Sequence, residues 1–122
     1  MIGYVTIGTN DLTKAAAFYD VLLAELGAKR VMVTEKFINW GNSPNGPLFS
    51  VIKPYDGEAA TVGNGVMVAL AAGNREAVDA VHAKAMELGG SDEGAPGERF
   101  AGFYAGYFRD LDGNKLNIFC MG

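Results

Sequence analysis

The sequence predicts an α+β fold built from two successive strand–helix–strand–strand–strand modules. Two segments carry the three- and four-residue spacing of apolar side chains that is typical of an amphipathic helix, and strand-like sequence follows each of them. The second segment also repeats the ending of the first, as Glu25-Leu26-Gly27 and Glu87-Leu88-Gly89. The 17 glycines among 122 residues indicate many tight turns and favour sheet over a helical bundle. We expect one domain over residues 1–122, with modules at about 1–55 and 63–122.

The first module is predicted to begin with an alternating strand at residues 2–8. A helix follows from Leu12 to Leu26, where Asn10 or Asp11 can cap its start and Gly27 can end it. Three further strands are predicted at residues 29–34, 37–40 and 48–53, with a turn rich in glycine, proline and asparagine at 41–47.

The second module follows a linker at residues 54–65 and is predicted to begin with a strand at 66–72. Its helix is capped by Asn74 and ends at Gly89-Gly90. An Asp-Gly turn at 110–114 joins strands predicted at 103–109 and 115–120. The strand expected near 91–97 has the weakest pattern.

Charge and composition exclude several classes of function. Fourteen acidic residues against ten basic ones leave a net charge of −4, and the basic residues are scattered, so we expect no nucleic-acid partner. The longest apolar run, residues 66–72, is far shorter than the roughly 18 residues of a membrane span, and the opening residues lack a signal-type apolar core. We therefore expect a cytoplasmic protein with no membrane partner. The single Cys120 excludes an internal disulfide and a multi-cysteine zinc site.

Four stretches spread over nearly the whole chain carry recognisable motifs. The most specific is the closing hairpin, Tyr107-Phe108-Arg109-Asp110-Leu111-Asp112-Gly113-Asn114-Lys115-Leu116. The other stretches are Tyr4-Val5-Thr6-Ile7 with Asp11-Leu12 and Phe18-Tyr19, Gly63-Asn64-Gly65-Val66-Met67-Val68-Ala69-Leu70, and Glu76-Ala77-Val78-Asp79-Ala80-Val81-His82. Together these motifs resemble those of one family, the vicinal oxygen chelate superfamily of glyoxalases, bleomycin-resistance proteins and extradiol dioxygenases, in which a proline stands at the position of Leu111.

The resemblance implies that two βαβββ modules form a curled, cup-shaped mixed sheet with helices outside, the glyoxalase/bleomycin resistance fold. Ligands would bind inside the cup. Enzymes of this family hold a divalent metal there through histidine and glutamate side chains, and the metal chelates adjacent oxygens of the substrate.

The positions that carry the family's metal ligands hold Tyr4, Met67 and Asn117 in this chain, with a possible fourth near Phe49 or Ser50. Tyrosine ligates only after losing a proton with a pKa of about 10, methionine is a soft ligand, and an amide carries no charge. We therefore expect no metal and no other cofactor, and a metal-dependent lyase or dioxygenase activity is not favoured.

The preferred interpretation is a protein that binds a small apolar or aromatic molecule in its cup. Core packing is the competing explanation for each aromatic residue, and strand alternation places Tyr104 and Tyr107 on opposite faces. Arg99 and Arg109 could meet an anionic ligand, although Arg109 could equally form a surface ion pair. The candidate cup residues are Tyr4, Trp40, Phe49, Met67, Tyr104, Tyr107, Asn117 and Phe119.

Two alternatives remain: a glyoxalase-type lyase resembling lactoylglutathione lyase, or another metal-dependent enzyme, and a non-catalytic structural module. No catalytic residue is predicted. His82 is expected to be a structural or surface residue of the second helix, and Cys120 a buried core thiol. Many proteins of this fold pair their modules across a two-fold axis, so a homodimer is the expected assembly.

Overall fold

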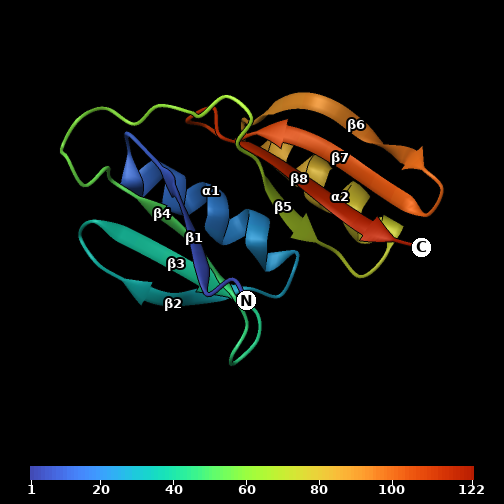
Figure 1. Ribbon diagram of the computed structural model, residues 1–122, viewed down its shortest axis with the longest axis horizontal. Coiled ribbons are helices and arrows are strands. Elements are labelled where there is room, and N and C mark those ends of the chain that lie inside the picture. The colour runs from blue at the N-terminus through green and yellow to red at the C-terminus, as the bar shows by residue number, and fades with distance from the viewer. The chain divides into compact units, whose positions relative to one another are not determined.

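The computed structural model describes residues 1–122 (Figure 1). The chain divides into two compact units, Met1–Thr61 and Val62–Gly122. Each unit contains one helix and one four-stranded mixed sheet, in the chain order strand, helix, strand, strand, strand. The predicted βαβββ modules are therefore confirmed, and their boundary lies inside the segment predicted as a linker.

The sheet of unit 1 has the order β1-β4-β3-β2, in which β1 runs parallel to β4 and the other pairs are antiparallel. The helix α1 begins where the Asp11 side chain accepts a hydrogen bond from the Lys14 N–H at 3.1 Å, as an N-cap does. The elements are β1 (Tyr4–Gly8), α1 (Leu12–Ala24), β2 (Lys29–Val33), β3 (Phe37–Gly41) and β4 (Leu48–Ile52).

Aromatic rings form the centre of the unit 1 core, between α1 and its sheet. The Tyr19 ring from α1 lies 5.8 Å from the Trp40 ring and 4.8 Å from the Phe49 ring, measured between centroids. Such pairs contribute roughly 0.5–1.5 kcal/mol each beyond the area they bury. The Trp40 Nε1–H donates to Asp20 Oδ1 at 2.9 Å, which satisfies the one polar atom that this ring brings into the core.

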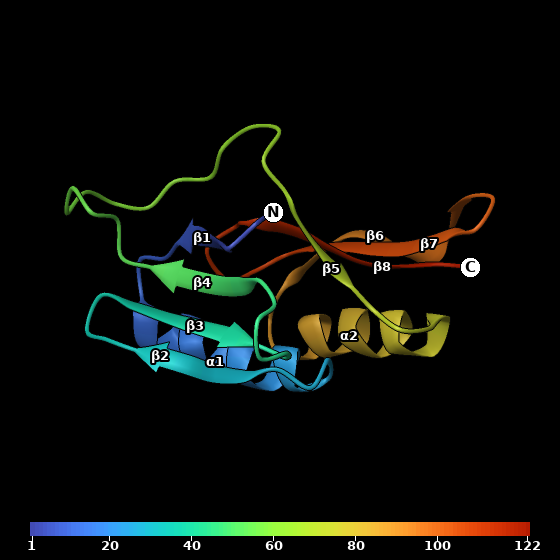
Figure 2. The ribbon, with the colours of Figure 1, turned by 60° about the horizontal axis from the view of Figure 1, so that its bottom comes forward.

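The sheet of unit 2 has the order β5-β8-β7-β6, again with one parallel pair, β5 with β8. Figure 2 shows α2 along one side of this sheet. Asn74 caps α2 by accepting from the Ala77 N–H at 2.8 Å. The elements are β5 (Val68–Ala71), α2 (Arg75–Glu87), β6 (Ser91–Phe100), β7 (Phe103–Arg109) and β8 (Lys115–Met121).

Aliphatic side chains dominate the core beneath α2. Val81 of α2 is fully buried, as are Leu116 and Ile118 of β8, and Cys120 is 4% exposed, which confirms the expected core thiol.

His82 is also buried, and its Nε2 lies 3.1 Å from both Asp92 Oδ1 and the Tyr107 carbonyl oxygen. Both partners are acceptors when Asp92 is ionised, so Nε2 carries the proton and His82 ties α2 to two strands. This is a structural histidine, as predicted.

Several element boundaries differ from the sequence prediction; α1, for example, ends at Ala24 instead of Leu26. The strand β1 begins at Tyr4, two residues late, and β5 begins at Val68 because a turn closes before it, where the Val66 N–H donates to the Gly63 carbonyl at 3.2 Å. The strand β6 is ten residues long and has three register shifts against β7, which explains its weak period-two pattern. No helix combines the length and the apolar character that crossing a bilayer requires.

Candidate functional site

The two faces of the unit 2 sheet are set by the alternation of side chains along β8. Leu116, Ile118 and Cys120 point toward α2, so Asn117 and Phe119 point away from it. Cross-strand pairing places Tyr107 opposite Asn117 and therefore on the same side. We call the side that points away from α2 the distal face; it carries Arg99, Phe103, Tyr107, Lys115, Asn117 and Phe119.

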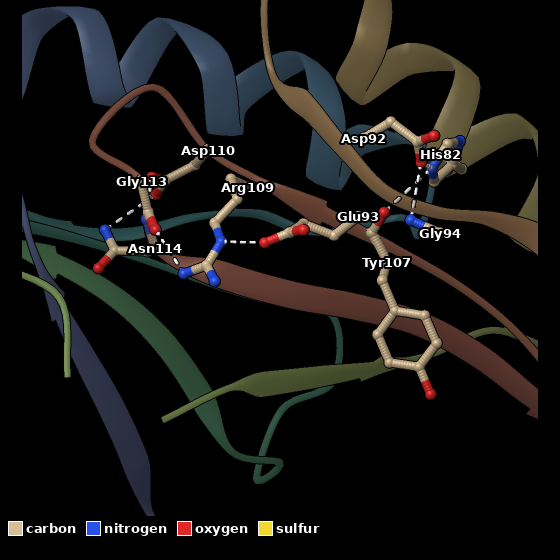
Figure 3. A network of polar contacts seen from close by, with 9 residues as sticks. All are labelled: His82, Asp92, Glu93, Gly94, Tyr107, Arg109, Asp110, Gly113 and Asn114. Carbon is tan, nitrogen blue, oxygen red and sulfur yellow. Dashed lines mark hydrogen bonds and ion pairs between the residues drawn. The ribbon is translucent and has the colours of Figure 1, made fainter. Parts of the chain in front are cut away.

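Tyr107 stands at the middle of the distal face. Figure 3 shows its ring pointing away from His82, while its backbone carbonyl accepts the histidine hydrogen bond. Asp92 Oδ1 is within reach of the same histidine nitrogen and also accepts from the Gly94 N–H at 2.9 Å. That backbone hydrogen bond, followed by the one from His82, holds the pKa of the Asp92 carboxyl below its ordinary value. The strand segment that presents Tyr107 is therefore fixed from the α2 side.

Asn117 is 2% exposed, and its Oδ1 is buried with no hydrogen-bond partner. It is the only buried side-chain nitrogen or oxygen in the chain in that state. An unpaired buried acceptor costs about 1–3 kcal/mol, so proteins rarely keep one without a reason. An N–H or O–H group of a bound molecule would remove this cost.

A row of phenylalanine rings crosses the distal face beside Asn117. The Phe100 and Phe103 rings stack with centroids 4.8 Å apart, and the Phe103 and Phe119 rings stack at 5.6 Å. Phe100 remains 62% exposed. Part of this aromatic surface is therefore available to a flat or apolar partner.

The closing hairpin next to the distal face uses its own polar groups. Asp110 Oδ1 accepts from the backbone N–H groups of Asp112 and Asn114, both at 2.9 Å. Figure 3 shows Asn114 beside Asp110. Arg109 forms an ion pair with Glu93 and donates to the Gly113 carbonyl at 3.0 Å. These groups build the turn and anchor Arg109, so Arg109 is a surface ion-pair residue.

Three of the predicted cup residues lie on the helix sides of their sheets. Trp40 and Phe49 are buried against Tyr19 of α1. Tyr104 lies on the α2 side, where its hydroxyl donates to Asp79 Oδ1 at 2.6 Å; that bond raises the pKa of the Tyr104 phenol. These three side chains are engaged with their own helices.

The other predicted residues lie away from the helices or beside the sheet. Tyr107, Asn117 and Phe119 come together on the distal face. Met67 directly precedes β5, two residues before Ala69, which pairs with Asn117. Tyr4 belongs to unit 1, where it is 68% exposed on β1. Sequence reasoning missed Lys115, whose ammonium lies 5.7 Å from the Tyr107 ring centre.

The residues at the family's metal-ligand positions do not fit a hard divalent ion. Met67 offers a soft thioether, and the orphaned oxygen of Asn117 belongs to a neutral amide. The chain has no group of three or more histidine, cysteine, aspartate or glutamate side chains that could hold a metal ion. The donor set thus provides neither charge nor imidazole nitrogen at these positions.

Unit 1 contains a separate open hollow of about 670 Å³ beside the start of α1. None of the predicted cup residues lines it. Its Arg30 is already paired with Asp20 at 2.7 Å, and this pairing holds the pKa of the Asp20 carboxyl below its ordinary value. The lining residues are Asn10, Asp11, Leu12, Thr13, Ala16, Arg30, Thr34, Glu35, Ile38 and Lys53.

Comparison with known proteins agrees with the two-module fold. The chain is similar to a glyoxalase/bleomycin resistance protein from Albidiferax ferrireducens T118, with 36% identity, a TM-score of 0.92, and coverage of 100% of this chain and 99% of that one. It shares its fold with a glyoxalase/bleomycin resistance protein/dioxygenase family enzyme from Burkholderia phytofirmans PsJN, at 19% identity, TM-score 0.79 and 98% coverage of both chains. It also shares its fold with lactoylglutathione lyase from Agrobacterium tumefaciens, at 18% identity, TM-score 0.72, and coverage of 98% and 92%.

The search of curated proteins gave no match. The family model of the Glyoxalase/Bleomycin resistance protein/Dioxygenase superfamily matches residues 1–118, nearly the whole chain. The chain therefore belongs to the Glyoxalase/Bleomycin resistance protein/Dioxygenase superfamily.

Proposed function

We propose that this chain is a metal-free member of its superfamily that binds a small molecule with an apolar or aromatic part on the distal face. The observation that carries the proposal is the buried Asn117 Oδ1, which has no hydrogen-bond partner. A bound N–H or O–H group would satisfy this oxygen, and the bond would fix the orientation of the ligand.

The aromatic residues around Asn117 supply the remaining attraction. Phe119 neighbours Asn117 along the same strand, and it continues the stacked row that begins at Phe100 and Phe103. Tyr107 lies directly across from Asn117 on the adjacent strand. A flat ligand can stack on such rings while one polar group reaches the amide, which is the usual balance in small-molecule sites.

A glyoxalase-type lyase is the alternative within the same superfamily. That chemistry needs a general base and an electrophile at the substrate. The one histidine of the chain uses its Nε2 proton for Asp92 and the Tyr107 carbonyl, and its ring contacts Phe108 on the α2 side. We therefore expect no turnover of the glutathione hemithioacetal of methylglyoxal, with or without added Zn²⁺ or Ni²⁺.

Ligand-observed NMR with a panel of neutral, anionic and cationic aromatic compounds tests the proposal. We expect saturation transfer to some members, and loss of that signal in Asn117→Leu, which keeps the approximate side-chain volume and removes the acceptor. Tyr104→Phe is the matched control, because it alters a polar group on the opposite side of the same sheet.

Binding that survives in Asn117→Leu would remove the distal face as the site. A panel in which nothing binds would favour the second alternative, a non-catalytic structural module.

The expected homodimer stays a prediction, which light scattering on the eluting protein would measure directly. The cytoplasmic location is likewise a prediction, to be tested by cell fractionation.

A further inference from the structure

We infer that the molecule bound on the distal face is an anion: an aromatic or apolar compound that carries an oxyanion such as a carboxylate, together with an N–H or O–H donor. The inference rests on the proposed function and names the chemical class of its ligand. It follows from two cations on this face that have no carboxylate partner.

Arg99 is the first of these cations. Its guanidinium carbon lies 5.4 Å from the centre of the Tyr107 ring, and its Nη2 donates to the Ala95 carbonyl oxygen at 2.6 Å. Gly97 leaves the space for it, because a Cβ at that position would come within 2.9 Å of Arg99 Nη1. The guanidinium is thus placed by its surroundings, yet it forms no ion pair with a carboxylate.

Lys115 is the second cation, and it approaches the same ring from β8. Its ammonium lies 5.7 Å from the Tyr107 centroid and likewise forms no ion pair. The third basic group nearby, Arg109, is neutralised by Glu93. The distal face therefore keeps two uncompensated positive charges in a chain whose net charge is −4. An approaching anion would be attracted to them.

The opposite side of the same sheet supplies the comparison. There Arg75 lies over the Tyr104 ring at 4.8 Å, in the same kind of cation–aromatic contact. Its charge, however, is matched by Glu98 at 2.7 Å. A cation stacked on a tyrosine thus occurs on both faces of this sheet, and only the distal one lacks a carboxylate.

Tyr107 connects the cations to the orphaned amide. It pairs with Asn117 on β8 and with Gly94 on β6, so it separates Arg99 from Asn117 by a single strand. Neighbouring strands lie about 4.8 Å apart, so the strands of Arg99 and Asn117 are about 10 Å apart, a distance that a bicyclic compound with a short side chain can span. Its oxyanion would meet Arg99 or Lys115, and its donor would meet Asn117 Oδ1.

Three probes that share the indole ring system and its N–H donor test the inference. Indole-3-acetate carries a negative charge, indole-3-acetamide is neutral, and tryptamine carries a positive charge. We expect the acetate to bind about tenfold more tightly than the amide, the difference that one charge-assisted contact makes, and tryptamine to bind most weakly. Titration calorimetry at two salt concentrations measures these affinities, and higher salt should reduce the preference for the acetate over the amide.

Variants assign the preference to residues. Arg99→Gln combined with Lys115→Gln should bring the acetate to the affinity of the amide, while Arg75→Gln is the matched control and should leave the order unchanged. Gly97→Ala provides a second test, because it keeps both charges but displaces the end of the Arg99 side chain. It should reduce the acetate preference without changing the affinity for the amide.

Equal binding of the three probes, or an acetate preference that survives the double variant, would overturn the inference while the proposed function stands. If no probe binds, the inference is also overturned, and the broader panel described above decides the proposed function separately.

Discussion

The two units follow the same chain order, but their main clusters of aromatic rings lie on opposite sides of their sheets. In unit 1, Trp40 and Phe49 face the helix and pack on Tyr19. In unit 2, Phe103 and Phe119 stack on the side away from the helix. When the Glu-Leu-Gly endings of the two helices are superposed, Tyr19 in α1 corresponds to Val81 in α2, and both are fully buried.

Under the proposed function, this difference lets one module plan serve two purposes. The ring of Tyr19 fills the space under α1 together with two other aromatic residues, so unit 1 uses these rings for stability. Val81 is smaller, and aliphatic residues of β8 pack beneath α2. The stacked rings of Phe103 and Phe119 lie on the distal face, where the proposed ligand would meet them, whereas Phe108 and Tyr104 face α2.

The largest expected effect comes from Trp40→Ala in unit 1. Removing this fully packed ring should lower the free energy of unfolding by about 3–5 kcal/mol. Phe119→Ala, on the distal face, should cost only about 1 kcal/mol, because its ring is less completely enclosed. Urea denaturation of both variants measures the contrast, and equal losses would contradict the assignment of the two rings to different purposes.

Asp20→Ala should have the next largest effect, because it leaves the Trp40 Nε1–H buried without an acceptor. We expect a loss of about 1–3 kcal/mol, whereas Asp20→Asn keeps an acceptor and should cost less than about 1 kcal/mol. The expected loss in Asp20→Asn, which removes only the charge, is small because the Asp20 side chain is 40% exposed and water screens its ion pair with Arg30.

The pH dependence of the Asp20 contribution has a definite sign. Because pairing with Arg30 lowers the pKa of Asp20 in the folded state, the contribution is complete above the unfolded pKa of about 3.9. It is lost as the pH falls through the lower folded value. Asp20→Asn should therefore flatten the acid limb of a stability–pH curve, and an unchanged limb would argue against the pairing in solution.

Asn117→Leu should raise stability, by about 1 kcal/mol at most, because it removes an unpaired buried acceptor. Thermal and urea unfolding without ligand measure this effect. Asn114→Leu is the contrasting variant, since Asn114 Nδ2 donates to Asp110 Oδ2 at 3.1 Å and its loss should destabilise the hairpin. A destabilised Asn117→Leu would indicate that the amide has a structural partner in solution.

The smallest expected effect is at Tyr104. Its hydrogen bond to Asp79 raises the phenol pKa in the folded state, so its contribution is present below the unfolded pKa of about 10 and is lost as the pH rises through the folded value. Tyr104→Phe should remove that alkaline slope: it should lower stability slightly at neutral pH, where the hydrogen bond is present, and leave it unchanged above the folded pKa. An unaltered slope in the variant would assign it to another group.

The order of elements could be predicted from the sequence because caps, glycine stops and apolar periods are local signals. The helix starts at Asp11 and Asn74 are examples, since each side chain accepts from an N–H three residues on. The hairpin at 110–114 was predictable for the same reason, because Asp110 organises it within the turn.

The candidate site was only partly predictable. Alternation shows that Tyr104 and Tyr107 lie on opposite faces, but it does not show which face meets the helix. The same limit applies to Trp40 and Phe49, whose burial depends on Tyr19 from another part of the chain. The space around Arg99 depends on the irregular register of β6, which a period-two pattern does not reveal.

The hydrogen bond from His82 to the Tyr107 carbonyl has a practical consequence for spectroscopy. The chain has one histidine, so its imidazole protons give one set of signals that needs no site-by-site assignment. That ring contacts the strand whose tyrosine stands on the distal face, yet it lies on the other side of the sheet from any bound compound. The chemical shifts of the His82 ring protons should therefore change when a ligand binds on the distal face, because the backbone transmits the effect. The ligand itself would not contact these protons.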